Sequence, residues 1–397
     1  MRVLSVGSLY PPQHLGGGYE LTWRSAVAHL RSRGDHVRVL ATDHRARSPD
    51  SAIAEDADVH RELRWYWRDH AFPRLSMRAR YATEGHNHAV LDRHLRELRP
   101  DVVNWWAMGA MSLSMIEAVR RRGLPAVGVV GDDWMVYGPE VDQWIRAFRR
   151  RPAAARAIAL ATGIPTHVDF DGAARWLFNS RGTRDRAERA GLRPRAAEVV
   201  HPGIDPQLFP RAAERSWDWR LLYLGRIEAR KGVEVTIRSL SELPRASLAV
   251  IGSGEDAYLS SMRSLVSELD LEKRVGFGLR PRNEIPRAYA GADAVLFPAG
   301  WEGWGLVPLE AMSVGVPVIA SAVGGPAEYL RDGENCLVYA PRDDPRALAA
   351  AVRRLAAEPP LRRRLREGGF PTAARFTEAA YNGAIATALD AEVRARR

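Results

Sequence analysis

The chain is nearly free of cysteine and lysine. Its one cysteine, Cys336, excludes an internal disulfide framework and leaves no cysteine cluster for a metal ion. Of 58 basic residues only Lys231 and Lys273 are lysines, so a lysine that persists against this arginine bias is a candidate for chemistry. No apolar run approaches the roughly 20 residues of a membrane span, and the N-terminal residues lack the long apolar region of a signal peptide. These absences favour a cytoplasmic protein.

The composition is that of a globular protein with two domains. The chain has 397 residues, of which 46% are hydrophobic and 27% charged, and this length exceeds what one core usually supports. The net charge of +10 lies mostly in the first half, which raises nucleic acid or a membrane surface as partners. No aromatic-interleaved basic motif accompanies it, so we expect no nucleic-acid binding. The charge instead suits phosphorylated or membrane-bound substrates, with peripheral membrane contact.

Residues 297–325, FPAGWEGWGLVPLEAMSVGVPVIASAVGG, carry the strongest signal. They predict a strand, a glycine-rich loop, a helix with Pro308 at its first position, and a second parallel strand. Glu302 lies on the loop and Glu310 in the expected first helical turn, where free N–H groups and the helix dipole favour an anion. Each feature alone is equally typical of a surface charge or a tight turn. Together they suit a ligand with hydroxyls at both ends and a phosphate between them, such as a sugar nucleotide.

The order of residues in this stretch resembles a family signature. The strings E-G-W-G-L-V-P-L-E-A-M, G-V-P-V-I-A-S and G-G-P-A-E are similar to those of retaining glycosyltransferases of family 4, which have the GT-B fold. The opening P-P-x-x-x-G-G-G-Y-E and the junction-like HPGID at 201–205 agree. The resemblance implies an α/β fold of two doubly wound Rossmann-like domains facing across a cleft. We expect an acceptor domain over 1–205, a nucleotide-sugar domain over 206–376, and a helix over 377–397 that returns to the first domain.

The loop GRIEARKG supplies two cations for the donor. Arg226 and Lys231 bracket a loop at a strand's C-terminal edge, from which they could reach a diphosphate or stand as solvated charges. The family's G-R-x-x-x-x-K-G pattern implies the first role. By the same resemblance Glu302 bonds sugar hydroxyls, Glu310 bonds ribose hydroxyls, and loops 252–255 and 279–282 hold the base through backbone groups. The other expected donor-binding residues are Gly17, Gly18, Gly225, Gly252, Arg280, Gly303, Trp304, Gly305 and Leu306.

Asp132 departs from the family pattern. It follows the strand 126–130 in the string G-D-D-W, where family members commonly have His-Asp with the histidine near the transferred sugar. Asp132 could accept a hydrogen bond from a sugar hydroxyl, help to deprotonate the acceptor, or cap a helix. A metal site at Asp132 and Asp133 is disfavoured, because the resemblance implies catalysis without a divalent ion or other cofactor. Asn104 likewise ends a strand where relatives often have histidine.

The expected activity is retaining, metal-independent hexosyl transfer. The donor would be a UDP- or GDP-linked sugar, and the acceptor a hydroxyl or amine of a small molecule, glycan or lipid-linked compound in natural-product or cell-surface glycan assembly. One rival is a nucleotide-sugar epimerase or pseudo-glycosyltransferase of the same fold, and another is a basic protein that binds nucleic acid or a membrane surface. The aromatic run Trp65-Tyr66-Trp67 could stack on sugar rings or pack in the core.

Overall fold

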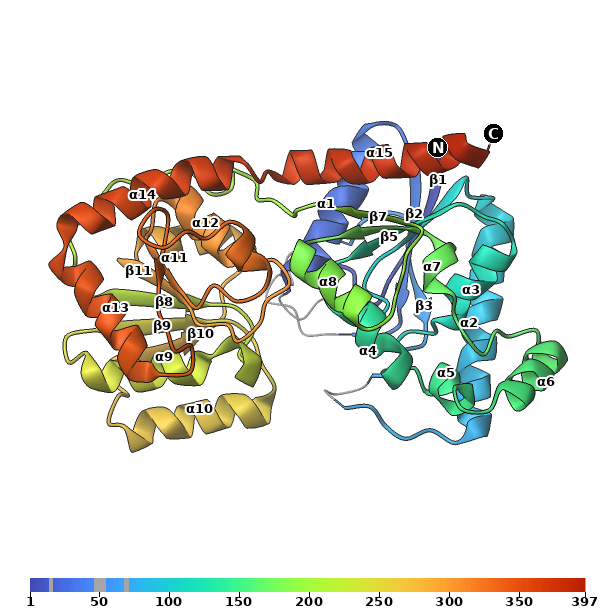
Figure 1. Cartoon of the computed structure of the whole chain (residues 1–397), viewed down its shortest axis with the longest axis horizontal. Helices are drawn as coiled ribbons and strands as arrows, with labels where there is room; N and C mark the ends of the chain where they lie inside the picture. Colours follow the sequence, from blue (N-terminus) through green and yellow to red (C-terminus); the bar gives the residue numbers. More distant parts are fainter. Residues whose placement is uncertain (14–16, 46–54, 68–70, 397) are drawn as a thin grey trace.

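The protein consists of two α/β domains, each built on its own parallel sheet (Figure 1). The computed structural model describes residues 1–13, 17–45, 55–67 and 71–396. Gly16, the first residue of the predicted glycine run, lies outside the described residues. None of the helices in these ranges is both long and apolar enough to cross a bilayer.

The first sheet has the strand order β3-β2-β1-β4-β5-β6-β7. Its strands are β1 (Arg2–Val6), β2 (His36–Thr42), β3 (Val59–Leu63), β4 (Val102–Trp105), β5 (Ala126–Val130), β6 (Arg175–Phe178) and β7 (Ala196–Val199). Strands β1, β4 and β5 are almost wholly buried, as expected of parallel strands covered on both faces. Strand order reverses between β1 and β4, which is where open α/β sheets bind ligands.

Helices cover both faces of this sheet. They are α1 (Gly18–Ser32), α2 (Met77–Leu98), α3 (Ser114–Arg121), α4 (Trp134–Val141), α5 (Gln143–Phe148), α6 (Pro152–Thr162), α7 (Phe170–Ala173) and α8 (Arg181–Arg189). Strand β3 is not among the elements predicted from the sequence. It lies at the sheet edge and only Leu63 is fully buried, so its sequence VHREL has no apolar pattern to reveal it.

The second sheet has the order β10-β9-β8-β11-β12-β13 and reverses between β8 and β11. Its strands are β8 (Arg220–Leu224), β9 (Ser247–Ile251), β10 (Val275–Gly278), β11 (Ala294–Phe297), β12 (Val318–Ala320) and β13 (Leu337–Val338). The helices around it are α9 (Val233–Ser239), α10 (Asp256–Glu268), α11 (Ile285–Ala290), α12 (Leu306–Val314), α13 (Pro345–Ala357) and α14 (Pro359–Ala374), with the short 3-10 helices η1 (Ala229–Lys231), η2 (Leu240–Glu242), η3 (Arg282–Glu284) and η4 (Gly325–Glu328).

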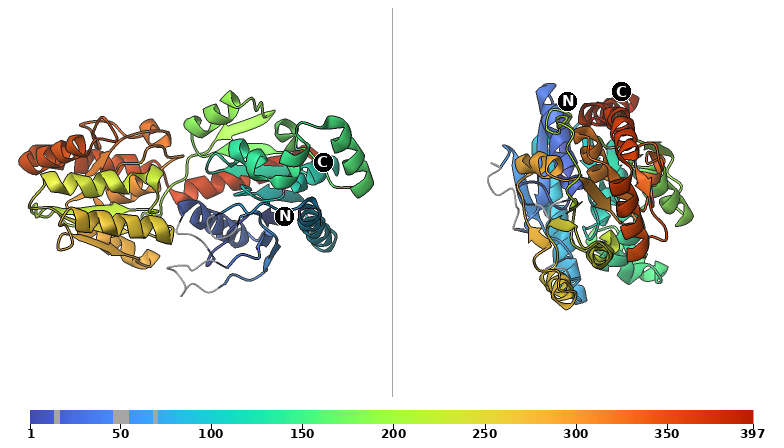
Figure 2. Two further views of the ribbon diagram at one scale, coloured as in Figure 1. Left: turned by 90° about the horizontal axis from the view of Figure 1, so that it is seen from below. Right: turned by 90° about the vertical axis from the view of Figure 1, so that its left-hand side faces the viewer.

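The last helix, α15 (Glu378–Arg396), leaves the second domain and packs on α1 of the first (Figures 1 and 2). Ile385 and Leu389 join the core formed with α1 and the sheet, and Asn382 donates a hydrogen bond to Ser25 Oγ at 2.7 Å. The chain's two crossings between domains meet in a short β-bridge between Ile204 and Thr377. The two domains are therefore joined by two adjacent segments that pair with each other.

Candidate active site

Lys231 and Glu302 form an ion pair at the C-terminal edge of the second sheet. Lys231 ends η1 after β8, and Glu302 lies in the loop after β11. These two strands are neighbours where the strand order reverses. Gly232 permits the approach, because its φ is +72° and a Cβ there would stand 2.4 Å from the carbonyl oxygen of Pro298. The fold thus joins a cation and a carboxylate at the position where such sheets bind ligands.

Both members of the pair are largely shielded from water. The side chains of Lys231 and Glu302 are 14% and 18% exposed. Burial lowers the pKa of Lys231, and attraction to Glu302 acts in the opposite direction. Burial would raise the pKa of Glu302, but the neighbouring charges of Lys231, Arg230 and Arg226 outweigh it and hold that pKa below its ordinary value. Glu302 is therefore a carboxylate at neutral pH.

Arg226 links this pair to the first domain. Its guanidinium lies 3.5 Å from the Glu228 carboxylate. Burial would lower the pKa of Arg226, but Glu228 and then Glu20, Glu302 and Asp132 raise it. Sequence reasoning missed Glu20, although it is the glutamate of the G-G-G-Y-E string and lies in the first turn of α1.

Of the three roles that the sequence leaves open for Asp132, the structure shows a capping-type hydrogen bond at the start of α4, and the two catalytic roles stay predictions. Its Oδ1 accepts a hydrogen bond from the backbone N–H of Trp134 at 2.9 Å, at the start of α4, and its Oδ2 faces the Tyr137 hydroxyl at 3.4 Å. Burial raises the pKa of Asp132 to about 6, while the Trp134 N–H and the positive charge of Arg226 act in the opposite direction. Asp132 is thus a turn-forming residue that titrates near neutrality.

We expect the rate of donor turnover to fall below pH 6 in the wild type and not in Asp132→Asn. The raised pKa of Asp132 means that the carboxylate form exists only above about pH 6, so a role that needs this form is lost on acidification. Because the fold disfavours the ionised form, Asp132→Asn should also raise the thermal midpoint at pH 7. The measurement is a pH profile of kcat/KM. An unchanged acid limb in the variant would contradict the assignment.

The loop after β11 touches the first domain. A Cβ at Gly303 would lie 2.9 Å from Asn179 Nδ2 and 3.0 Å from the carbonyl oxygen of Gly131. Arg186 of α8 pairs with Asp133 at 2.9 Å and stacks over the Trp301 ring at 4.5 Å. The edges of the two sheets therefore face each other directly.

The remaining predicted glycines lie along the same two edges. Gly17 precedes α1 as its N-cap. A Cβ at Gly18 would be 3.0 Å from the Leu306 side chain of the other domain, and a Cβ at Gly252 would be 1.8 Å from the carbonyl oxygen of Gly225. Only a hydrogen atom fits at Gly252, because the neighbour is backbone, whereas at Gly18 the Leu306 side chain would have to shift.

Helix α12 begins earlier than its sequence predicts. Gly305, with φ of +87°, is its N-cap, so the helix starts at Leu306 and Pro308 occupies the third position. The prediction of Pro308 at the first position is wrong, and Glu310 lies in the second turn instead of the first. A proline is accommodated in the first turn because the N–H groups there have no intrahelical partner.

Glu310 is a buried member of a three-residue network. The residue is 2% exposed. Its carboxylate pairs with Arg282 at 2.7 Å and accepts a hydrogen bond from the Tyr289 hydroxyl at 2.7 Å. Sequence reasoning missed Arg282 and selected its neighbour Arg280, which forms an exposed ion pair with Glu284 at 3.2 Å.

The Trp304 side chain belongs to the domain junction. It is 2% exposed and stacks on His201 at 4.2 Å, with Phe376 and Tyr329 against its other sides. Its predicted part in donor binding can therefore come only from its backbone amide.

We expect Trp304→Ala to lower the free energy of unfolding by about 3–5 kcal/mol, the usual cost of truncating a buried aromatic residue. The matched control is Trp301→Ala, which removes a half-buried tryptophan and its cation–π contact with Arg186 from the same loop, and should cost less because less apolar surface is lost. Denaturant melts compare the two. Equal losses would place Trp304 outside the core of the junction.

Two further candidates from the sequence make packing contacts. Asn104 is 1% exposed and bonds the Val127 carbonyl at 3.0 Å and the Trp106 indole N–H at 2.6 Å. Trp65 and Trp67 pack partly against the first domain's core. Asn104 is therefore held inside the core by its hydrogen bonds, and stacking of the aromatic run on a sugar ring stays a prediction.

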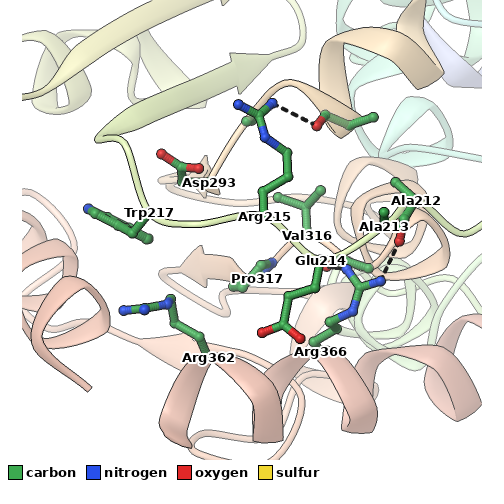
Figure 3. A pocket seen from close by; sticks show the side chains of 13 residues that line it. Ala212, Ala213, Glu214, Arg215, Trp217, Asp293, Val316, Pro317, Arg362 and Arg366 are labelled. Carbon is green, nitrogen blue, oxygen red and sulfur yellow. Dashed lines mark hydrogen bonds between the residues drawn. The ribbon is translucent and has the colours of Figure 1, made fainter. Parts of the chain in front are cut away.

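A small pocket of about 50 Å³ lies elsewhere on the second domain (Figure 3). Asp293 and Pro317, which line it, precede β11 and β12, so it opens at the N-terminal edge of the sheet. Arg366 and Arg215 in its wall are bound to the backbone carbonyls of Ala212 and Ala290. It is therefore separate from the site at the facing edges.

Two family models match the chain almost end to end. Residues 16–208 match Glycosyltransferase Family 4, and residues 206–370 match Glycosyl transferases group 1. The chain belongs to glycosyltransferase family 4. The D-inositol 3-phosphate glycosyltransferase of Mycobacterium sp. (strain KMS) is 37% identical over 154 residues, 35% of each chain. That of Nocardioides sp. is 34% identical over 212 residues, 46% of each. The match thus spans about a third to a half of these curated family 4 relatives.

Solved structures share the whole architecture. Sucrose-phosphate synthase from Thermosynechococcus elongatus superposes with a TM-score of 0.76 at 20% identity, covering 100% of both chains. Anabaena HepE, in complex with UDP and glucose, gives a TM-score of 0.72 at 19% identity, covering 98% of this chain and 99% of that one. At these identities the likeness shows the fold, and the fold of this family 4 member is GT-B.

Proposed function

We propose that the chain is a retaining glycosyltransferase that moves a sugar from a nucleotide-diphosphate sugar to a hydroxyl or amine. Membership of family 4 supports this activity. The observation that carries it is the Lys231–Glu302 pair at the β8–β11 reversal, with Arg226 beside it. Cations fixed at this edge suit the charge that develops on a departing diphosphate.

The proposal assigns the residues of the site to the diphosphate, the sugar and the ribose. Arg226 and Lys231 stabilise the leaving diphosphate, and the amides of residues 303–306 contact phosphate and sugar. Glu302 orients Lys231 and accepts hydrogen bonds from sugar hydroxyls. Glu310 accepts from the ribose hydroxyls, which requires one of its two present bonds to be exchanged for the ligand's.

The transfer needs no covalent enzyme intermediate. The acceptor oxygen or nitrogen forms its bond to the anomeric carbon on the face from which the diphosphate departs, and the acceptor's proton passes to the leaving diphosphate. Asp132 follows Gly131, whose carbonyl oxygen lies against Gly303 of the second domain, and the charge of Arg226 acts on its pKa. As a carboxylate it orients a sugar hydroxyl or assists removal of the acceptor's proton.

The donor is proposed to be UDP- or GDP-linked. The structural neighbour HepE is described with UDP and with UDP-glucose, which supports a uridine donor by analogy. The curated relatives are named for D-inositol 3-phosphate, and the net charge of +10 would suit an anionic acceptor here as well. Peripheral contact with an anionic membrane remains part of the proposal for lipid-linked acceptors.

A thermal-shift screen with UDP-, GDP-, ADP- and TDP-sugars tests the proposal, because a ligand that binds only the folded state raises its apparent stability. We expect one nucleotide class to raise the midpoint. Mass spectrometry and the anomeric configuration of the product then identify the transfer as retaining. A donor that is epimerised without transfer would favour the epimerase rival, and the absence of any stabilising donor would contradict the proposal.

A further inference from the structure

Two histidines and a glutamate converge on the first domain between β3 and α2, elements that pack beside each other (Figure 1). His60 and Glu62 are alternate residues of β3 and so share one face of the strand. His94 comes from α2 and is 1% exposed. One ligand atom from each residue lies within 4.8 Å of the others. Sequence reasoning did not find this group, because His94 is distant in the chain and β3 was not predicted.

The distances from Glu62 to the two histidines are those between neighbouring ligands in a coordination shell. Glu62 Oε1 lies 3.3 Å from His60 Nδ1 and 3.5 Å from His94 Nε2. Bonds of about 2.0–2.1 Å to a tetrahedral zinc ion place neighbouring ligand atoms roughly 3.3–3.4 Å apart. His94 Nε2 also lies 3.4 Å from Arg93 Nη2, so an ion would enter as the Arg93 guanidinium moves aside. Two histidines and one glutamate are also a known zinc donor set, with a fourth position left for water.

Asp58 and Arg93 orient two of the proposed ligands, His60 and Glu62. His60 Nε2 lies 2.8 Å from Asp58 Oδ1, so the proton on Nε2 points to Asp58 and the Nδ1 lone pair faces Glu62. A carboxylate that fixes a histidine tautomer is the usual outer partner of a metal ligand. Arg93 binds Oε2 of Glu62, so Oε1 is the oxygen that faces the two histidines.

We infer that His60, Glu62 and His94 bind one divalent zinc-class cation. The ion ties the edge strand β3 to α2, away from the strand ends that carry the donor site. The transfer reaction does not depend on this ion, because the proposed diphosphate site is built on the loops after β8 and β11 of the other domain. Two cations lie near the cluster: Arg93, and Arg38 at 3.4 Å from His94 Nδ1. Since they repel a metal ion, we expect weaker affinity than in a closed four-ligand site.

Titration of the chelator-treated full-length protein with Zn²⁺ and Co²⁺ tests this inference. We expect one equivalent of zinc, a rise of the thermal midpoint, and with cobalt the visible absorption of a tetrahedral site. His60→Gln and Glu62→Gln should abolish all three, and Asp58→Asn should weaken affinity about 10–100-fold. The matched control is His36→Gln, an exposed histidine that pairs with the other oxygen of Asp58, and this variant should bind zinc as the wild type does.

Three results would overturn the inference: no stoichiometric zinc in the wild type, normal binding by His60→Gln, or loss of binding in His36→Gln as well. Stabilisation by a nucleotide sugar, measured in the same variants without metal, reports whether each is folded. Because the donor site is on the other domain, failure of zinc binding leaves the proposed transfer untouched, and failure of donor binding leaves the zinc site untouched.

Discussion

Replacing Lys231 with methionine should lower kcat for donor turnover about 100- to 1000-fold, the usual cost of removing one preorganised charge-stabilising donor. Lys231 is shielded, held by Glu302 and placed where the loops after β8 and β11 meet. Its charge is therefore fixed before the diphosphate leaves. Methionine keeps the length and apolar stem of the side chain while removing the charge. Release of nucleoside diphosphate from the donor, with and without acceptor, measures the effect.

The chain provides its own control for this experiment. Lys273 is the other lysine and is exposed after α10, so Lys273→Met removes the same charge far from the site and should keep wild-type kcat. The thermal midpoint of Lys231→Met must also be compared, since Glu302 loses its partner. Wild-type turnover by a folded Lys231→Met protein would remove Lys231 from the chemistry.

Glu310→Gln should raise the KM for the donor about 10- to 100-fold and change kcat less. A hydrogen bond to a charged group contributes about 1.5–3 kcal/mol, and the amide keeps the size of the side chain while losing its charge. The change also leaves Arg282 without its carboxylate, so a lower thermal midpoint is expected alongside weaker donor binding.

Glu284→Gln is the matched control. Glu284 also pairs with an arginine, Arg280, but both are exposed, and exposed pairs contribute little. Donor KM and thermal midpoint should therefore stay near the wild-type values in that variant. If Glu310→Gln lowers stability without changing donor KM, the residue is structural and the ribose assignment fails.

Sequence alone predicts the architecture and the strand-end loops. Buried strands such as β5 are continuous apolar runs, and the glycines and the apolar residues around Glu302 predict a loop followed by a helix. The edge strand β3 and the position of Pro308 could not be predicted, for two different reasons. The first has too few buried residues to leave a pattern, and the second depends on the positive φ of Gly305.

The pairing of site residues is the part that sequence could not supply. Lys231 and Glu302 are both predicted from motifs, but their mutual ion pair depends on which strands are neighbours. Glu310 is likewise predicted, whereas its partner Arg282 could not be told from Arg280 without the helix geometry. The burial of a side chain that follows a strand could not be predicted from the sequence either. Burial is what raises the pKa of Asp132 to about 6.

Arg226 and Lys231 are proposed to form a diphosphate site at the β8–β11 reversal, and calorimetric titration with UDP or GDP against the matching nucleoside tests this. We expect the diphosphate to bind the wild type at least about tenfold more tightly than the nucleoside, since each hydrogen bond to a charged group contributes about 1.5–3 kcal/mol. The Arg226→Met, Lys231→Met double variant should lose this difference while still binding the nucleoside. An undiminished preference for the diphosphate in the double variant would show that these two cations do not form the diphosphate site.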